Sequence, residues 1–142
     1  MSVLRRPPSI RLSIREELDV VIARAKVREL AACEGCADGA ADALATATSE
    51  VARNIIVHAR FGELCLDVVQ EPHGRAIVIV ARDTGPGIAD LEQAMQDGYT
   101  TARGLGLGLS SARRLVDDFD VISAPDRGTT VTLKKWVPRT TN

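Results

Sequence analysis

The stretch that decides the fold holds two glycine clusters separated by a short loop. The first reads Asp83-Thr84-Gly85-Pro86-Gly87, and the second reads Gly104-Leu105-Gly106-Leu107-Gly108-Leu109-Ser110. Glycine lets the backbone approach a ligand closely because it has no Cβ, and it tolerates positive φ. Two such sites on either side of a loop indicate a nucleotide, with the base at one cluster and the phosphates at the other.

The second cluster leads directly into a helical pattern. Leu109, Ala112, Leu115 and Val116 are spaced for one face of a helix. A helix N-terminus carries free N–H groups and a partial positive charge, and both attract anions. We therefore expect phosphates to bind there, although a flexible turn would explain either cluster equally well on its own.

Upstream, Glu50 and Asn54 lie four residues apart in a helical run from Ala40 to Ala59. This spacing places them on one helix face. Asn54 can offer its side-chain carbonyl oxygen to Mg²⁺, a hard cation that favours oxygen ligands. Glu50 could orient an attacking hydroxyl or take its proton. Without other evidence, the same two residues would more often form a solvated surface.

Four motifs, taken in order, resemble those of the GHKL superfamily of ATPases and kinases: Glu50-x-x-x-Asn54, Asp83-x-Gly85-x-Gly87, Gly104-x-Gly106-x-Gly108 and Gly128-Thr129. The match spans roughly residues 9 to 136. Two further segments are similar to the RsbT-type switch kinases, which are small bacterial serine/threonine protein kinases related to anti-sigma factors. These segments are Ser49-Glu-Val-Ala-Arg-Asn54, and Asp97-Gly-Tyr-Thr-Thr101 with the glycines that follow it.

The resemblance implies a role for each matching residue. Asp83 would accept a hydrogen bond from the exocyclic amine of adenine, and Thr129 would lie near the base. Glu50 would be catalytic, and Asn54 would bind Mg²⁺. The remaining positions that would hold the cofactor ATP are Gly85, Gly87, Gly104, Leu105, Gly106, Leu107 and Gly108. Arg103 could contact the terminal phosphates, since a delocalised cation suits phosphoryl charge, or could equally be a solvated surface residue.

The pattern along the chain predicts alternating strands and helices. In the first half we expect a strand at 10–14, a helix that ends near Cys33, a long helix that Asp38 caps, and a strand near 64–68. A turn at 72–74 and a central strand at 76–81 follow. The rest of the chain should form a short helix at 90–96, a lid at 97–103, a helix at 107–118, and a hairpin of 121–124 with 129–136. Hairpins and helices gathered in this way predict an α/β protein with a two-layer α/β sandwich.

The resemblance implies the same architecture, the Bergerat fold of histidine-kinase-like ATPases. That fold has a mixed, mainly antiparallel sheet with helices on one face. We expect a single domain over residues 1–142, in which residues 1–8 are flexible.

Composition limits the function classes. The 142 residues are 45% hydrophobic but only 3% aromatic, so we expect an aliphatic core. A formal net charge of −1 argues against direct binding to nucleic acid or to a membrane surface. No uninterrupted apolar stretch approaches the roughly 18 residues of a membrane-spanning helix, and the N-terminus does not resemble a signal peptide. A cytoplasmic location is therefore expected.

Other nucleotide and cysteine motifs fit poorly. The chain has neither a P-loop nor the H-R-D and D-F-G motifs of eukaryotic-type kinases, and no third glycine completes a dinucleotide fingerprint. Cys33-Glu-Gly-Cys36 spells a C-x-x-C, but a zinc or redox site would want a second pair or histidines at ligand spacing. We therefore expect ordinary thiols at a helix end.

Two function classes remain open. The first is an ATP-dependent serine/threonine protein kinase that phosphorylates a STAS-domain partner and is then released to a second partner, such as a phosphatase. The alternative is an anti-sigma factor, or another binding module that uses nucleotide only to set affinity. The presence of both Glu50 and Asn54 favours the enzyme.

Overall fold

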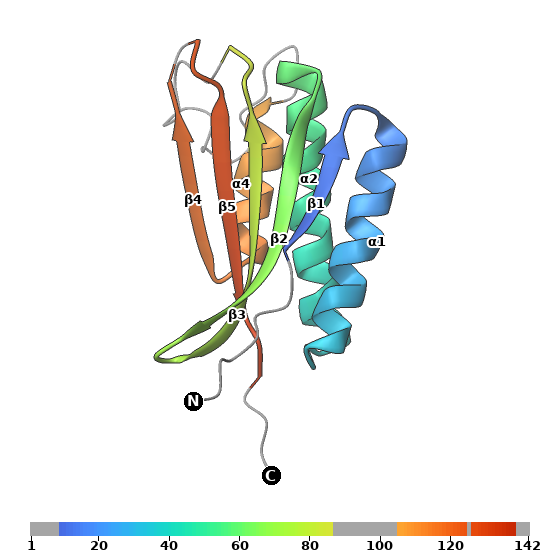
Figure 1. Cartoon of the computed structure of the whole chain (residues 1–142), viewed down its shortest axis with the longest axis vertical. Coiled ribbons are helices and arrows are strands. Elements are labelled where there is room, and N and C mark those ends of the chain that lie inside the picture. Colours follow the sequence, from blue (N-terminus) through green and yellow to red (C-terminus); the bar gives the residue numbers. More distant parts are fainter. Residues whose placement is uncertain (1–8, 87–104, 125, 139–142) are drawn as a thin grey trace.

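The computed structural model describes residues 9–86, 105–124 and 126–138. In chain order, the elements are β1 (Ile10–Ile14), α1 (Glu17–Cys33), α2 (Asp38–Ala59), β2 (Gly62–Glu71), β3 (Gly74–Asp83), α4 (Leu105–Leu115), β4 (Asp118–Ser123) and β5 (Thr129–Trp136). The strands form one sheet in the order β1-β2-β3-β5-β4, and each described pairing is antiparallel. The helices cover one face of this sheet (Figure 1). The expected two-layer α/β sandwich is confirmed.

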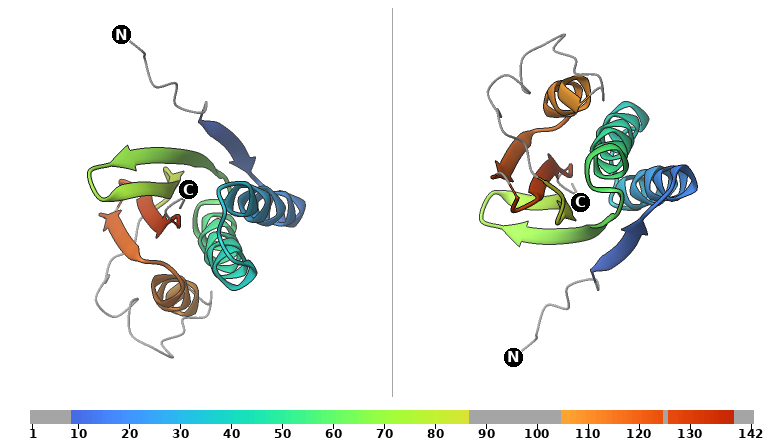
Figure 2. Two further views of the ribbon diagram at one scale, coloured as in Figure 1. Left: turned by 90° about the horizontal axis from the view of Figure 1, so that it is seen from below. Right: turned by 90° about the horizontal axis from the view of Figure 1, so that it is seen from above.

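Helix α2 occupies the middle of the helical layer. It packs against α1 on one side and α4 on the other (Figure 2). Its buried positions are mostly small, including Ala41, Ala45, Ala47 and Ala52. Because the distance between packed helices depends on the side chains at the contact, these alanines allow α1 and α4 to lie close to α2.

Strand β3 is the centre of the sheet, as its β-branched sequence predicts. Ile77, Ile79 and Ala81 are buried on the side of the helices, whereas Val78 and Val80 lie on the other side and are partly exposed. Strand β2 alternates in the same way. The core is aliphatic, as the low aromatic content predicts, and it includes residues of every described helix and of strands β1, β2, β3 and β5.

Several element boundaries differ from the prediction. Strands β2 and β3 are longer than expected, β4 begins at Asp118 and not at residue 121, and the ends of two helices also differ. Helix α2 has Ala37 at its N-cap, and Asp38 lies in the first turn, where its carboxylate is 3.8 Å from Arg28 of α1. Helix α4 begins at Leu105 and ends at Leu115. It cannot extend to Asp118, because Asp118 already pairs with Lys134 in the β4–β5 ladder.

Three predictions fall outside the described residues. These are the flexible residues 1–8, the short helix at 90–96 and the lid at 97–103. Among the helices that the structure describes, none is both long and apolar enough to cross a membrane.

Candidate nucleotide-binding site

A pocket lies between α2, α4 and the adjoining ends of β3 and β5. Three of the expected site residues line it, namely Asn54, Asp83 and Thr129. The rest of its lining is mostly apolar and consists of Val51, Ile55, His58, Ala81, Leu109 and Val131. The fold therefore brings together residues from three distant segments of the sequence.

The carboxylate of Asp83 is fixed by the backbone at the end of β3. Its Oδ1 atom accepts hydrogen bonds from the N–H groups of Gly85 at 3.0 Å and Thr129 at 3.2 Å. Its Oδ2 atom accepts none from any residue that the structure describes. One oxygen thus orients the group, and the other remains able to accept a hydrogen bond from a ligand.

Tight backbone packing holds Asp83 in place. Gly128 has a φ of +78°, and a Cβ at that position would lie 2.1 Å from the carbonyl oxygen of Asp83. No side chain fits there, so glycine is required on both conformational and steric grounds. The hydroxyl of the next residue, Thr129, lies 2.9 Å from the Ser123 hydroxyl. The strand ends that carry Asp83 and Thr129 are therefore rigidly paired.

Gly85 serves packing as well as any ligand. A Cβ on Gly85 would lie 2.6 Å from the Cβ of Ala59, at the end of α2. The missing side chain lets the loop after β3 contact α2 directly. This contact explains the glycine without reference to a bound base.

Glu50 and Asn54 meet helix α4 at Gly108. A Cβ on Gly108 would lie 3.1 Å from both amide atoms of Asn54 and 3.3 Å from Oε2 of Glu50. The Nδ2 atom of Asn54 is buried and has no hydrogen-bond partner among the residues that the structure describes. Leaving a buried donor unpaired costs about 1–3 kcal/mol, so the asparagine is not there to stabilise the fold. An unpaired polar group beside a glycine is an arrangement suited to a ligand.

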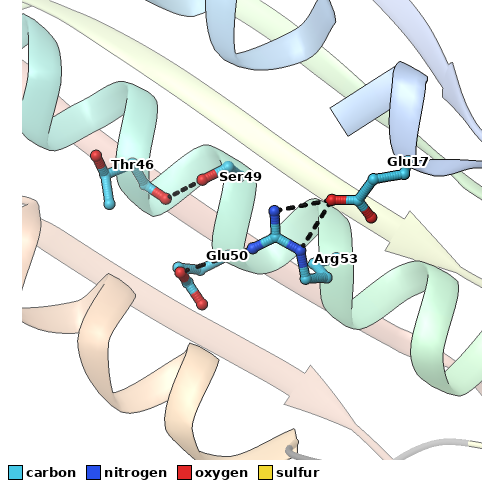
Figure 3. Close-up of polar contacts among 5 residues, drawn as sticks. All are labelled: Glu17, Thr46, Ser49, Glu50 and Arg53. Atoms are coloured by element: carbon cyan, nitrogen blue, oxygen red, sulfur yellow. Dashed lines mark hydrogen bonds and ion pairs between the residues drawn. The ribbon is translucent and has the colours of Figure 1, made fainter. Parts of the chain in front are cut away.

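Arg53 ties Glu50 to helix α1 (Figure 3). Its Nη1 atom is 3.9 Å from Oε1 of Glu50, while Nε and Nη2 donate to Oε1 of Glu17 at 3.2 and 3.0 Å. The structure thus places Arg53 between two carboxylates of its own chain. The Glu50 side chain is 32% exposed, so an incoming hydroxyl can reach it.

The described residues fit a magnesium site that depends on the nucleotide. They contain no group of three or more His, Cys, Asp or Glu side chains that could hold a metal ion. Mg²⁺ commonly uses one or two protein ligands together with substrate phosphates and water. A single amide ligand from Asn54 is consistent with that mode. The metal ion would then bind together with the nucleotide.

The space in this pocket that the centre of a water-sized molecule can enter is only about 20 Å³. This is room for about one water molecule, and an adenine ring is much larger. The base must therefore occupy the open part of the pocket, or the surrounding side chains must move when it binds.

The remaining predicted residues divide into two groups. Leu105, Gly106 and Leu107 form the first turn of α4, so the second glycine cluster does open a helix. Gly87, Arg103 and Gly104 lie outside the described residues. Sequence reasoning missed His58, which lines the pocket one helical turn beyond Asn54. The i, i+4 spacing of residues 50, 54 and 58 was the available signal.

The C-x-x-C segment forms no site among the residues that the structure describes. Cys33 is exposed at the end of α1, Cys36 is buried, and both are free thiols. Gly35 between them has a φ of +93°, which is consistent with the expected stop of the helix. Burial raises the pKa of the Cys36 thiol above its ordinary value.

We expect the two thiols to differ in reactivity. The thiolate is the nucleophile, and a raised pKa leaves less thiolate on Cys36 at any given pH. Iodoacetamide at about pH 8 should therefore modify Cys33 well before Cys36, as measured by peptide mass spectrometry over time. Equal rates in the folded protein would contradict the burial of Cys36.

Comparison with known proteins identifies the family of the chain. Residues 13–135 match the family model of the histidine kinase-like ATPase domain. The serine/threonine-protein kinase RsbT of Bacillus subtilis (strain 168) is 37% identical over 124 residues, which are 87% of this chain and 93% of that protein. The anti-sigma F factor of the same strain is 34% identical over 101 residues, 66% of this chain and 68% of that protein. Because the family model covers most of its length, this chain belongs to the histidine kinase-like ATPase domain family and, as its motifs predicted, to the RsbT-like group within the GHKL superfamily.

Proposed function

We propose that this protein is an ATP-dependent serine/threonine protein kinase of a bacterial partner-switching pathway. The observation that carries the proposal is the meeting of Glu50 and Asn54 with Gly108 of α4, beside a pocket in which Asp83 keeps one carboxylate oxygen available. The similarity to a protein named as a serine/threonine kinase supports it.

Asp83 would select the base. Its Oδ2 atom can accept a hydrogen bond from the exocyclic amine of adenine. Guanine carries a carbonyl group at that position, which would place two acceptors against each other and leave both unpaired. The apolar side chains of Val51, Ile55 and Val131 would contact the ring. We infer that the pocket widens on binding, because its enclosed volume is too small for the base.

Asn54 and Glu50 would act at the other end of the nucleotide. When bound, Mg²⁺ supplies the charge neutralisation that phosphoryl transfer needs, and Asn54 would hold it through Oδ1. Glu50 would accept the proton of the serine or threonine hydroxyl of the partner. Arg53, held by Glu17, limits the positions that the Glu50 carboxylate can adopt.

We further propose a STAS-domain protein as the phosphorylated partner, with release of the kinase to a second partner such as a phosphatase. A cytoplasmic location, where ATP is available, fits this role. The alternative is an anti-sigma factor that uses nucleotide only to set its affinity, and the similarity to anti-sigma F factors keeps it in view. Transfer of phosphate to a protein separates the two.

Replacing Asp83 by asparagine is expected to weaken ATP binding about 5- to 150-fold, which corresponds to the roughly 1–3 kcal/mol of a lost charged hydrogen bond. The reason is that the amide can turn a donor toward the amine of adenine. Calorimetric titration with ATP and GTP, in the presence of Mg²⁺, measures both affinity and base preference. Wild-type protein should bind ATP more tightly than GTP.

Asp120→Asn is the matched control. Asp120 is exposed on β4 and does not line the pocket. Its replacement therefore makes the same chemical change away from the proposed site. Both variants should unfold like the wild type. An unchanged ATP affinity in Asp83→Asn would remove the adenine assignment.

A further inference from the structure

A second cavity lies at the same end of the sheet but on its other face. Its volume is about 390 Å³, and Ser13, Glu63, Arg82 and Thr130 are among the residues that line it. These four are paired across β1, β2, β3 and β5 in one row. The adjacent row of Leu64, Ala81 and Val131 is buried under the helices. Since neighbouring residues of a strand point to opposite faces, the cavity faces away from the helices.

Arginine side chains outnumber carboxylates in this region, three to two. Arg15 and Arg82 line the cavity, and Arg60 joins Arg15 and Phe61 in an adjoining hollow of about 320 Å³. None of the three arginines makes an ion pair with a residue that the structure describes. Glu63 supplies a carboxylate in the cavity wall. Asp83, whose Oδ1 atom accepts hydrogen bonds from two backbone N–H groups, supplies a second carboxylate.

Two features of the loop between α2 and β2 also require an explanation. Phe61 leaves 59% of its surface in water. Arg60 has a φ of +73°, a conformation that favours glycine or asparagine. Unfavourable backbone conformations cluster at functional sites. An exposed aromatic ring and a strained arginine side by side are thus more consistent with binding than with folding.

We propose that this arginine cavity, formed by Arg15, Arg60, Phe61 and Arg82 with the row from Ser13 to Thr130, is a docking site for an acidic segment of a protein partner. The three guanidinium groups outnumber the carboxylates of Glu63 and Asp83, which favours an anionic ligand, and arginine binds carboxylates with paired hydrogen bonds. Arginine and aromatic residues are also the usual anchors of protein interfaces. The cavity is larger than a single inorganic phosphate would fill.

The segment and the nucleotide would bind at the same time. Asp83 lines both cavities, but the nucleotide pocket lies among the helices and the arginine cavity lies on the opposite face of the sheet. A bound acidic segment therefore does not compete with ATP. The proposal concerns binding alone, so its test is independent of the kinase reaction.

The experiment is a titration of the ¹⁵N-labelled full chain with an acetylated acidic hexapeptide that contains two leucines, followed by amide chemical shifts. The largest changes in amide chemical shift on adding the peptide should occur at Ser13, Phe61, Arg82 and Thr130. These changes should become smaller as salt is added. Saturating ATP should not remove them. Arg15→Gln and Arg82→Gln should each weaken the peptide about tenfold, near the loss of one charged hydrogen bond.

The matched control is Arg11→Gln, at an exposed arginine of β1 outside the cavity, which should leave the affinity unchanged. A peptide with glutamine and asparagine in place of its acidic residues should not bind. The proposal is overturned if Arg11→Gln weakens binding as much as the cavity variants, if the shifts spread over all exposed arginines, or if ATP displaces the peptide. Equal shifts with inorganic phosphate at similar concentrations would also overturn it, because they would identify a simple phosphate site.

Discussion

Replacing Asn54 by alanine is expected to lower the rate of phosphoryl transfer by at least about 100-fold, or about 2.7 kcal/mol in activation free energy. The reason is that catalysis of phosphoryl transfer consists mostly of positioning and charge neutralisation, and Asn54 is the proposed ligand of Mg²⁺. The measurement is the rate of transfer from labelled ATP to the partner protein at saturating Mg²⁺.

The same variant should keep or gain stability. The Nδ2 atom of Asn54 is buried without a partner in the described part of the chain, so its removal relieves a cost instead of breaking a contact. The free energy of unfolding, measured in urea, should therefore be at least that of the wild type. Val57→Ala, at an exposed position of the same helix, is the control for truncation. Transfer at the wild-type rate by Asn54→Ala would exclude Asn54 as a required magnesium ligand. A large loss of stability would show that the residue is structural.

Glu50→Gln is expected to slow transfer by about 100- to 10,000-fold, the range for a lost general base, while ATP affinity changes little. Glutamine keeps the size of the side chain but cannot take a proton at neutral pH. Its weakened contact with the partly exposed Arg53 should cost less than about 1 kcal/mol of stability. Transfer rate and calorimetric ATP affinity, measured on the same preparation, separate chemistry from binding.

Glu29→Gln provides the control, because Glu29 is an exposed carboxylate of α1 with no part in the site. It should transfer phosphate at the wild-type rate. If Glu50→Gln also does so, proton removal by Glu50 is excluded. If its ATP affinity falls as steeply as its rate, Glu50 acts in nucleotide binding and not in the chemical step.

The periodicity of the chain was sufficient to predict most of the fold. Ile77, Ile79 and Ala81 are buried in the central strand, and residues 44, 51 and 55 are buried on α2, at spacings that match one face of a strand and one face of a helix. The ends of the elements were less predictable. Asp38 is a good capping residue, yet Ala37 occupies the N-cap position of α2. The Oδ1 atom of Asp38 instead lies 3.8 Å from Nη2 of Arg28. Such contacts join separate elements and leave no local pattern.

The site was predictable where backbone geometry restricts the residue type. Gly128 and Gly108 mark places where a Cβ would meet Asp83 or the Glu50–Asn54 pair. Long-range partners could not be predicted. The pairing of Arg53 with Glu17 depends on how α1 packs on α2, and the hydrogen bond from the Thr129 N–H to Asp83 depends on the register of β3 with β5. His58 follows the same spacing as Glu50 and Asn54, but it carries no motif.

A crystal structure of the protein with Mg²⁺ and a non-hydrolysable ATP analogue is the most direct test of the nucleotide site. We expect the exocyclic amine of adenine within hydrogen-bond distance of Asp83 Oδ2, and Mg²⁺ bound to Asn54 Oδ1 and to phosphate oxygens. The volume of the pocket beside Ile55 and Val131 should be larger than the value of about 20 Å³ found without the base. An analogue bound elsewhere, or a metal ion held without Asn54, would contradict the assignment.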